Sequence, residues 1–267
     1  MVLDDADNAA LVPLLSPERL QALTILTGSS SEAIALHQQT LAVGSQLMKV
    51  VATIEIALRN AVEINLQNHF AVPNWLQQPP VQFQWRSEES RKITRALDSA
   101  RRAEYAKLNQ AGKTALDAVA YPNGRPALVT HLQRSKARRK QIPVTHGKII
   151  AELTLYFWKR LFGSEYQQSL WRPSLKRVFP NKQLKRADVA VQLEAIYQAR
   201  NRLAHHEPVL HQRFSQTITA IEFVAHELTA QAGAGKPALA KLLAADIDRV
   251  VGAEAELRAR LDGFRIA

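Results

Sequence analysis

The sequence predicts an all-α protein, and three observations support this fold class. Apolar residues recur at spacings of three and four along most of the 267-residue chain, which is the period of a helix with one buried face. Alternating, strand-like patterns are scarce. Hairpin turn signals are nearly absent, with the Asn123-Gly124 pair as the exception. We therefore expect a helical bundle with additional N- and C-terminal helices.

The longest predicted helix begins at Ser30. It has a single apolar stripe, formed by Leu47, Val51, Ile54, Leu58, Val62 and Leu66. The helix should end before Pro73, because the residue that precedes a proline is disfavoured in helical geometry. Further helices are predicted at residues 88–108, 146–162, 188–206, 213–230 and 238–261. Residues 123–143 contain two prolines and the densest positive charge, and they predict a loop or a short helix.

The predicted helices suggest one main domain. Residues 1–230 form this helical domain, with a basic insertion at about 120–145. Residues 231–267 form a C-terminal helical appendage, because Gly233, Gly235 and Pro237 interrupt the helical pattern between the two parts. A boundary near residues 120–140 is the alternative.

Composition excludes several classes of protein. The chain has no cysteine, which excludes disulfide frameworks, thiol nucleophiles and cysteine-ligated metal sites. Its N-terminus carries acidic residues where a signal peptide needs basic ones, and we find no run close to the ~20 apolar residues that span a bilayer. We expect a cytoplasmic protein with no membrane partner.

The positive charge is concentrated in two tracts. The chain has 35 Lys and Arg residues against 24 Asp and Glu, a net charge of +11. No acidic residue occurs between Ala118 and Ala151 or between Tyr166 and Ala187. Such tracts favour a polyanionic partner such as RNA, although a solvated surface is the alternative. The predicted RNA-binding residues are Arg134, Lys136, Arg138, Arg139, Lys140, Arg172, Lys176 and Arg177.

Other sequence motifs lack residues that their chemistry requires. Gly112-Lys113-Thr114 lacks the first glycine of a phosphate-binding loop, and Gly235-Lys236 is followed by proline where such a loop needs Ser or Thr. His205 and His206 are neighbours, so on a helix they point about 100° apart and cannot share one ion. We therefore expect no metal site and no cofactor.

One segment combines a core stripe with a charged residue. On the predicted helix 188–206, Val189, Leu193, Ile196 and Leu203 form the buried stripe, and Arg200 falls on it. A guanidinium among core positions is costly unless it is paired or faces a wet cleft. A structural Arg–carboxylate pair, with a satisfied histidine at the helix end, is therefore one interpretation.

The other interpretation is a catalytic site. Tyr197, Asn201 and His205 form a polar stripe beside Arg200, so Arg200, Asn201 and His205 are predicted to face one pocket. Histidine can move protons near neutral pH, and arginine stays charged and matches phosphate oxygens. This pairing suits metal-independent RNA cleavage by the 2′-hydroxyl, with Asn201 positioning the phosphate or the imidazole.

Three segments resemble a known family. Residues 200–208, Arg-Asn-Arg-Leu-Ala-His-His-Glu-Pro, resemble the Arg-Asn-x-x-x-His signature of the HEPN superfamily, in its Abi-like (abortive infection) branch. Residues 55–60 (Glu-Ile-Ala-Leu-Arg-Asn) and the aromatic-rich residues 153–171 are similar to the same branch. The likeness spans roughly residues 45–215.

The resemblance implies a HEPN-type bundle that forms a homodimer and brings two Arg–His motifs into one basic cleft. Many members are metal-independent ribonucleases that act as toxins or in antiviral (phage) defence, so an antitoxin or an activator protein is a possible partner. Arg200 and His205 would be catalytic and Asn201 would assist. The supporting residues would be His206, Glu207, Glu55, Arg59 and Tyr197, with Glu55 and Arg59 spaced for an ion pair. A non-catalytic RNA-binding or partner-binding module is the alternative.

Two structural requirements follow from the catalytic interpretation. Arg200 must not be locked against a buried carboxylate, and His205 must face an opening or a partner chain. The aromatic residues Phe157, Trp158, Phe162 and Trp171 are expected in the core rather than as platforms for RNA bases.

Overall fold

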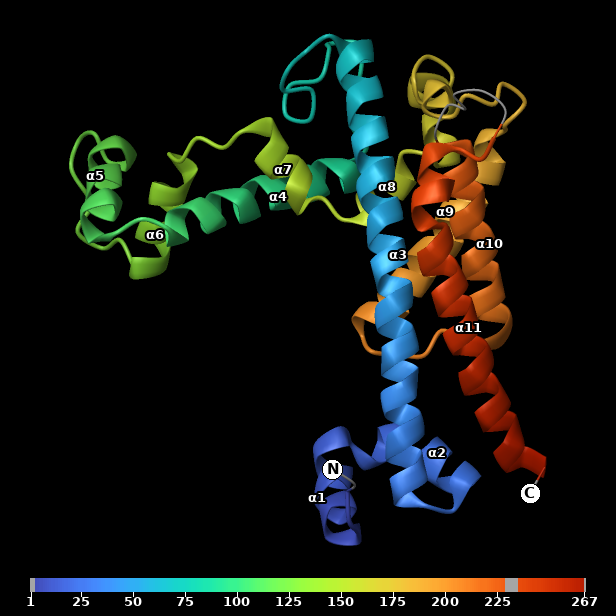
Figure 1. Ribbon diagram of the computed structural model, residues 1–267. Coiled ribbons are helices and arrows are strands. Elements are labelled where there is room, and N and C mark those ends of the chain that lie inside the picture. The colour runs from blue at the N-terminus through green and yellow to red at the C-terminus, as the bar shows by residue number, and fades with distance from the viewer. Residues whose placement is uncertain (1–2, 229–234, 267) are drawn as a thin grey trace. The chain divides into compact units, whose positions relative to one another are not determined.

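A computed structural model describes residues 3–228 and 235–266 of the chain (Figure 1). Within these residues the regular elements are all helices, which confirms the predicted all-α class. The chain divides into two compact units. Unit 1 comprises residues 1–61 and 176–267, and unit 2 comprises residues 62–175.

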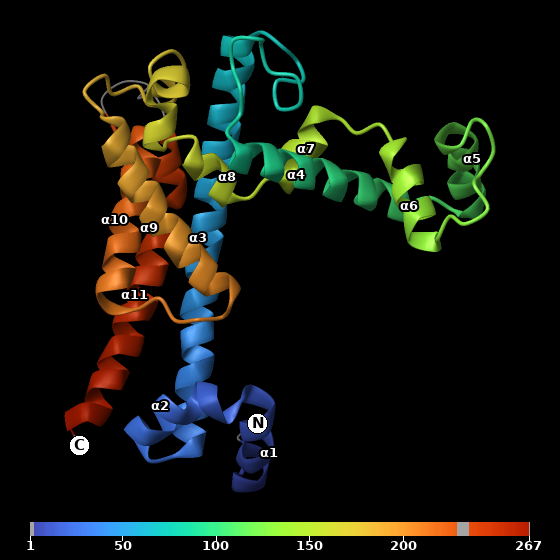
Figure 2. The same ribbon diagram turned by 180° about the vertical axis from the view of Figure 1, so that it is seen from behind.

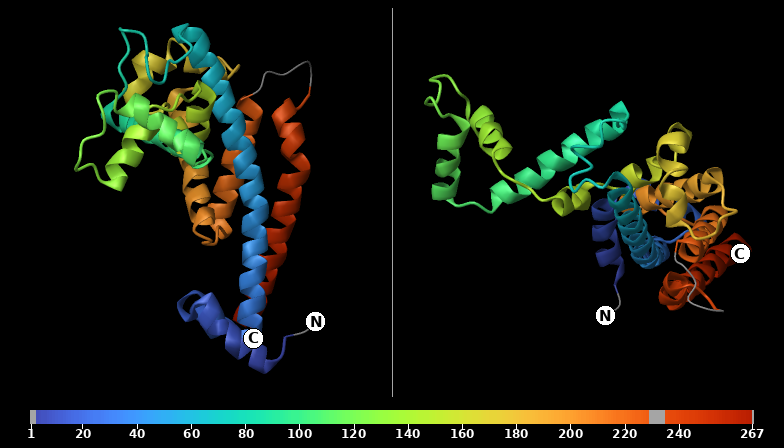
Figure 3. Two further views of the ribbon diagram at one scale, coloured as in Figure 1. Left: turned by 90° about the vertical axis from the view of Figure 1, so that its left-hand side faces the viewer. Right: turned by 90° about the horizontal axis from the view of Figure 1, so that it is seen from above.

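Unit 1 is built from long helices that lie side by side. Its elements are α1 (Asp5–Leu15), α2 (Pro17–Thr27), α3 (Ser30–Phe70) as far as Ala61, α9 (Arg186–Ala204), α10 (His211–Glu227) and α11 (Ala238–Ile266). Helix α10 packs against both α9 and α11 (Figure 2), and α11 also contacts α2. Two ion pairs join α3 to α11 (Figure 3), Lys49–Asp246 at 2.8 Å and Arg260–Glu32 at 2.6 Å.

Unit 2 contains the rest of α3 and a series of shorter helices. These are α4 (Ser87–Ala106), α5 (Gln110–Ala120), α6 (His131–Lys140), α7 (His146–Glu152), α8 (Leu155–Arg160), η1 (Ser164–Tyr166) and η2 (Gln167–Trp171). Helix α4 packs against α6 and α7, and α5 packs against α6. Phe157, Trp158, Phe162 and Trp171 are all buried, which confirms the prediction that they belong to the core.

Most predicted helices are present, with ends shifted by a few residues. The apolar stripe of α3 is fully buried from Leu47 to Leu66. The end predicted at residue 230 for α10 lies outside the described residues. Helix α6 occupies part of residues 123–143, where a loop or a short helix was predicted, and it begins at a capping box formed by Thr130 and Gln133. Helices α1, α2 and α5 were not predicted.

The single helix predicted at residues 146–162 is wrong. Leu153 and Thr154 are both extended, so α7 ends at Glu152 and α8 begins at Leu155. Leu153 and Leu155 are both buried, while Thr154 is exposed. Residues two apart point to the same side in extended backbone but roughly 200° apart in a helix, so the break lets both leucines enter the core.

One helix passes the test of length and composition for a membrane span. In α3 an 18-residue window has a mean hydropathy of 1.5, and 33% of that window is buried. The sequence analysis did not anticipate this window. The same test also selects core helices of soluble proteins and signal sequences, so it does not by itself assign a span.

The predicted boundary between residues 230 and 231 falls within residues 229–234, outside the described residues. Helix α11, the main element of the predicted appendage, lies in unit 1 and contacts α10 and α2.

Candidate functional site

Helix α9 carries the predicted constellation in unit 1. Its stripe of Val189, Leu193, Ile196 and Leu203 is buried as predicted. The side chain of Arg200 keeps 34% of its surface exposed, and its Nε lies 3.9 Å from Oε2 of Glu55 on α3. This distance is too long for a hydrogen bond, so the guanidinium is near a carboxylate without being locked to it.

Helix α9 ends directly before the two histidines. Ala204 is the last helical residue, and His205 follows as the C-cap with a φ of −98°. His206 has a φ of 57°, in the left-handed region that a residue with a side chain rarely occupies. The chain therefore turns sharply, and His205 and His206 do not continue the helix that was predicted to reach residue 206.

Several contacts hold this turn, which comprises residues 205–208. The guanidinium of Arg202 lies 3.1 Å from a carboxylate oxygen of Glu207, and its Nε donates to the carbonyl of Pro208 at 3.2 Å. The backbone N–H of Glu207 donates to the carbonyl of Arg202 at 2.8 Å. Arg19 of α2 donates to the carbonyl of His205 at 3.4 Å. The turn is thus fixed from its own helix and from α2.

A second left-handed residue follows the turn. His211, the first residue of α10, has a φ of 56°, and its backbone N–H donates to Oε1 of Glu254 at 3.3 Å. Glu254 belongs to α11 and is only 4% exposed. Backbone in this rare region persists where its surroundings hold it, and it is often found near functional sites.

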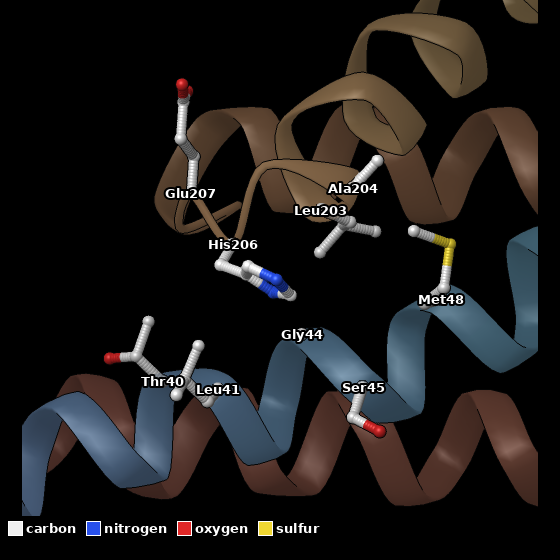
Figure 4. Close-up of a pocket in the computed structure, with 9 residues that line it drawn as sticks. All are labelled: Thr40, Leu41, Gly44, Ser45, Met48, Leu203, Ala204, His206 and Glu207. Carbon is white, nitrogen blue, oxygen red and sulfur yellow. The ribbon is translucent and has the colours of Figure 1, made fainter. Parts of the chain in front are cut away.

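A groove of about 390 Å³ lies between the turn and α3 (Figure 4). Figure 4 shows the imidazole of His206 directed into this groove and the carboxylate of Glu207 directed away from it. Gly44 forms part of the floor, and a Cβ added there would lie 3.4 Å from Leu203. The remaining lining residues are Thr40, Leu41, Ser45, Met48 and Ala204.

The groove does not gather the predicted catalytic set. Arg200, Asn201 and His205 were expected to face one pocket, but this groove is lined by His206 and Glu207 instead. Arg200 and Asn201 are half-buried and His205 is exposed. Helix α9 ends at Ala204, so His205 is the C-cap and not part of the helical stripe. Tyr197, also half-buried, remains on α9 one turn before Asn201.

The second helical motif, on α3, forms a different pair from the predicted one. Glu55 lies 3.9 Å from Arg200, and among the described residues no ion pair joins Glu55 to Arg59. The Nε of Arg59 is buried and has no hydrogen-bond partner. Within the described part of the chain, no three His, Asp or Glu side chains are grouped so that they could hold a metal ion.

The first basic tract has an inner and an outer face in unit 2. Arg138 is only 5% exposed, and its Nε and Nη2 donate to the two oxygens of Asp117 at 2.6 Å. Arg134 binds the same carboxylate. The guanidinium of Arg138 is therefore not available to a phosphate. Lys136 and Lys140 are exposed, and Arg139 is half-buried and donates to the carbonyl of Ser135.

The second basic tract is exposed at the predicted positions. Arg172, in unit 2, is exposed. Lys176 and Arg177, in the short helix η3 (Leu175–Val178), are exposed residues of unit 1.

Sequence reasoning missed several residues around the turn. Arg19 lies in a helix that was not predicted, and Thr40 and Ser45 lie on the face of α3 that borders the groove. No local pattern connects Glu254 to His211, because the hydrogen bond spans 43 residues. These partners depend on tertiary packing.

Comparison with known proteins adds no assignment. The chain matches no protein-family model, no curated protein and no solved structure. The function is therefore argued from the geometry of the site and from the sequence motifs.

Proposed function

We propose that this protein is a metal-independent endoribonuclease of the HEPN type that cleaves RNA through the 2′-hydroxyl. The observation that carries the proposal is the end of α9. There, the guanidinium of Arg200 is partly exposed and lies 3.9 Å from Glu55. His205 follows as an exposed residue of the turn. Both side chains can thus reach a strand that lies along the end of the helix.

Each residue has a defined role in this proposal. The 2′-hydroxyl oxygen attacks the neighbouring phosphorus, and the bond to the 5′-oxygen breaks. The 2′-hydroxyl loses a proton and the departing 5′-oxygen gains one; His205 carries the proton from the first to the second, because imidazole exchanges protons near neutral pH. Arg200 stabilises the extra negative charge on the phosphate oxygens. Asn201, the residue after Arg200, positions the phosphate.

The biological setting belongs to the same proposal. We propose that the enzyme acts as a homodimer, in antiviral defence by abortive infection or as a toxin, and that an antitoxin or an activator protein controls it. Lys136 and Lys140 in unit 2, and Lys176 and Arg177 in unit 1, are exposed cations that support contact with an RNA backbone.

The experiment is end-group analysis of RNA incubated with the purified protein. We expect fragments that end in a 2′,3′-cyclic phosphate and begin with a 5′-hydroxyl, with unchanged yield in EDTA. Arg200→Ala and His205→Ala should each abolish cleavage, while Lys241→Ala, at an exposed site on α11 in the same unit, should not. Full activity of both active-site variants would refute the proposal.

Two observations favour a second candidate, a non-catalytic RNA-binding or partner-binding module. Arg200 does lie beside Glu55, and the groove next to the turn is not lined by His205. In this case labelled RNA would shift in a gel without cleavage products, and His205→Ala would leave the shift unchanged.

A further inference from the structure

A second cavity in unit 1 lies beside the turn, on the side of α2. Its volume is about 430 Å³, within the range of pockets that hold small organic molecules. It shares Thr40, Leu41, His206 and Glu207 with the groove described above. Its other walls come from α2, from α3 and from Leu261 of α11. Helices α2 and α3, the turn and α11 therefore line one space.

The walls of this cavity are mainly apolar. Leu23, Leu41, Leu210 and Leu261 supply branched aliphatic side chains, and Ala22 and Pro208 add further apolar surface. Such walls suit the body of a ligand rather than a string of polar groups, because apolar contact in a shielded space gains free energy in proportion to the area buried.

The polar groups on the walls carry a positive bias. Arg19 has no carboxylate within 4.0 Å among the residues that the structure describes, and its guanidinium donates a hydrogen bond to the backbone carbonyl of His205. The only acidic lining residue, Glu207, is paired with Arg202 at 3.1 Å. The guanidinium of Arg19 is therefore the uncompensated charge at this cavity.

A histidine that lines the same cavity has a ring nitrogen without a hydrogen-bond partner. The Nδ1 of His37 is buried and has no hydrogen-bond partner. Burial and, to a smaller extent, the charge of Arg19 lower the pKa of His37 below its ordinary value. An anion in the cavity would neutralise the charge of Arg19, and its head group would lie beside the imidazole of His37.

We propose that this cavity binds a small organic anion with an apolar body, its carboxylate or phosphate head between Arg19 and His37. The apolar body would lie against Leu23, Leu41 and Leu261. A guanidinium fork matches the oxygens of either head group. His206 lines the same space, so the ligand would also touch the turn.

Decanoate tests this proposal, with decanol as the uncharged match and inorganic phosphate as a head group without a body. Isothermal titration calorimetry of the full chain should give one saturable site for decanoate, with at least tenfold weaker binding of decanol and of phosphate. Arg19→Gln should remove the preference for decanoate over decanol. Arg249→Gln changes the charge equally at an exposed position on α11 in the same unit and should have no effect.

A second measurement locates the site. In protein labelled with ¹⁵N at its 8 histidines, decanoate should move the ring resonances of His37 and His206 and leave the other resonances in place. Equal binding of decanoate and decanol, an unchanged decanoate affinity in Arg19→Gln, or unmoved His37 and His206 resonances would each overturn the proposal. Loss of decanoate binding when the protein self-associates would also overturn the proposal, because a second copy of the chain would then cover the cavity. Binding is measured without RNA, so the result does not depend on cleavage.

Discussion

Nε of Arg200 lies 3.9 Å from Oε2 of Glu55, and both side chains keep part of their surface in solvent. A pair at this distance contributes little to stability, on the order of 1 kcal/mol or less. The arginine can therefore leave Glu55 for a phosphate at small cost. The relationship between these two residues decides between a structural and a catalytic role for Arg200.

Paired substitutions at these positions separate the two roles. Arg200→Ala should lower the rate of RNA cleavage by about 100-fold or more, because one stabilising group for the transition state is lost. Glu55→Gln should leave the rate within a few-fold, because it removes only the resting partner. Cleavage assays and chemical denaturation of both variants test this. A large loss of stability in both, with no change in rate, would make the pair structural.

The backbone of His206 predicts an unusual effect of glycine. His206→Gly should keep the free energy of unfolding equal to that of the wild type or raise it by up to about 1 kcal/mol, because glycine adopts a positive φ without the steric cost of a side chain. His205 has a φ of −98°, so His205→Gly should lower it by about 0.5–1 kcal/mol. Urea unfolding measures both. Equal losses in the two variants would contradict this prediction.

The bond between Asp117 and Arg138 predicts a pH-dependent stability of α5 and α6. Hydrogen bonds from Arg138 and Arg134 hold the pKa of Asp117 well below its ordinary value of 3.8. A carboxylate with a lowered pKa in the folded state stabilises the fold above about pH 4, and this contribution is lost as the pH falls through the folded-state pKa. Amides in residues 110–140 should therefore exchange faster, relative to the intrinsic exchange rate at each pH, as the solution is acidified.

Asp117→Asn should show the faster exchange already at neutral pH. Asp98→Asn, at an exposed position on α4, is the matched control and should leave exchange unchanged. If Asp117→Asn exchanged as slowly as the wild type at neutral pH, the two arginines would not depend on this carboxylate.

A half-buried histidine in unit 2 predicts a second pH-sensitive range of stability, nearer to neutral pH. Both ring nitrogens of His146 are buried without hydrogen-bond partners, and Nε2 lies 3.8 Å from Glu63. Burial lowers the pKa of His146 below 6.5. The unfolded chain then binds the proton more readily, so stability is full above about pH 6.5 and falls as the pH is lowered.

The melting temperature should accordingly drop more between pH 7.5 and pH 5.5 in the wild type than in His146→Gln. His131→Gln, an exposed histidine in the same unit, should follow the wild type. A larger drop in His146→Gln would mean that the protonated ring is stabilised, with Glu63 as its partner.

The outer face of α6 predicts a change in the salt dependence of RNA binding. Lys136→Gln with Lys140→Gln should weaken binding and lower the slope of log affinity against log salt by about 1.4, at about 0.7 per phosphate contact with a single strand. Arg91→Gln with Arg95→Gln removes the same charge from α4 and should change the slope less. Filter binding at several salt concentrations compares them. Equal slopes in the two double variants would leave no special role for α6.

Sequence periodicity predicted the features of the fold that depend on residues close together in the chain. The stripe of α3, the buried face of α9 and the central aromatic core follow from spacing and hydrophobicity, and the structure has them. It could not predict where α9 stops, because His205 and His206 have no strong local stop signal and the turn depends on Arg19 and Arg202. Nor could it predict that Arg138 faces inward, because Asp117 lies 21 residues away.

Gly44 gives the groove a floor made of backbone. Any larger side chain there would project toward Leu203 and occupy the space that His206 faces. The size of the residue at position 44 therefore sets the depth of the groove beside the turn. Substitution of Gly44 by residues of increasing size, from alanine to leucine, should fill the groove in steps without altering a charged group.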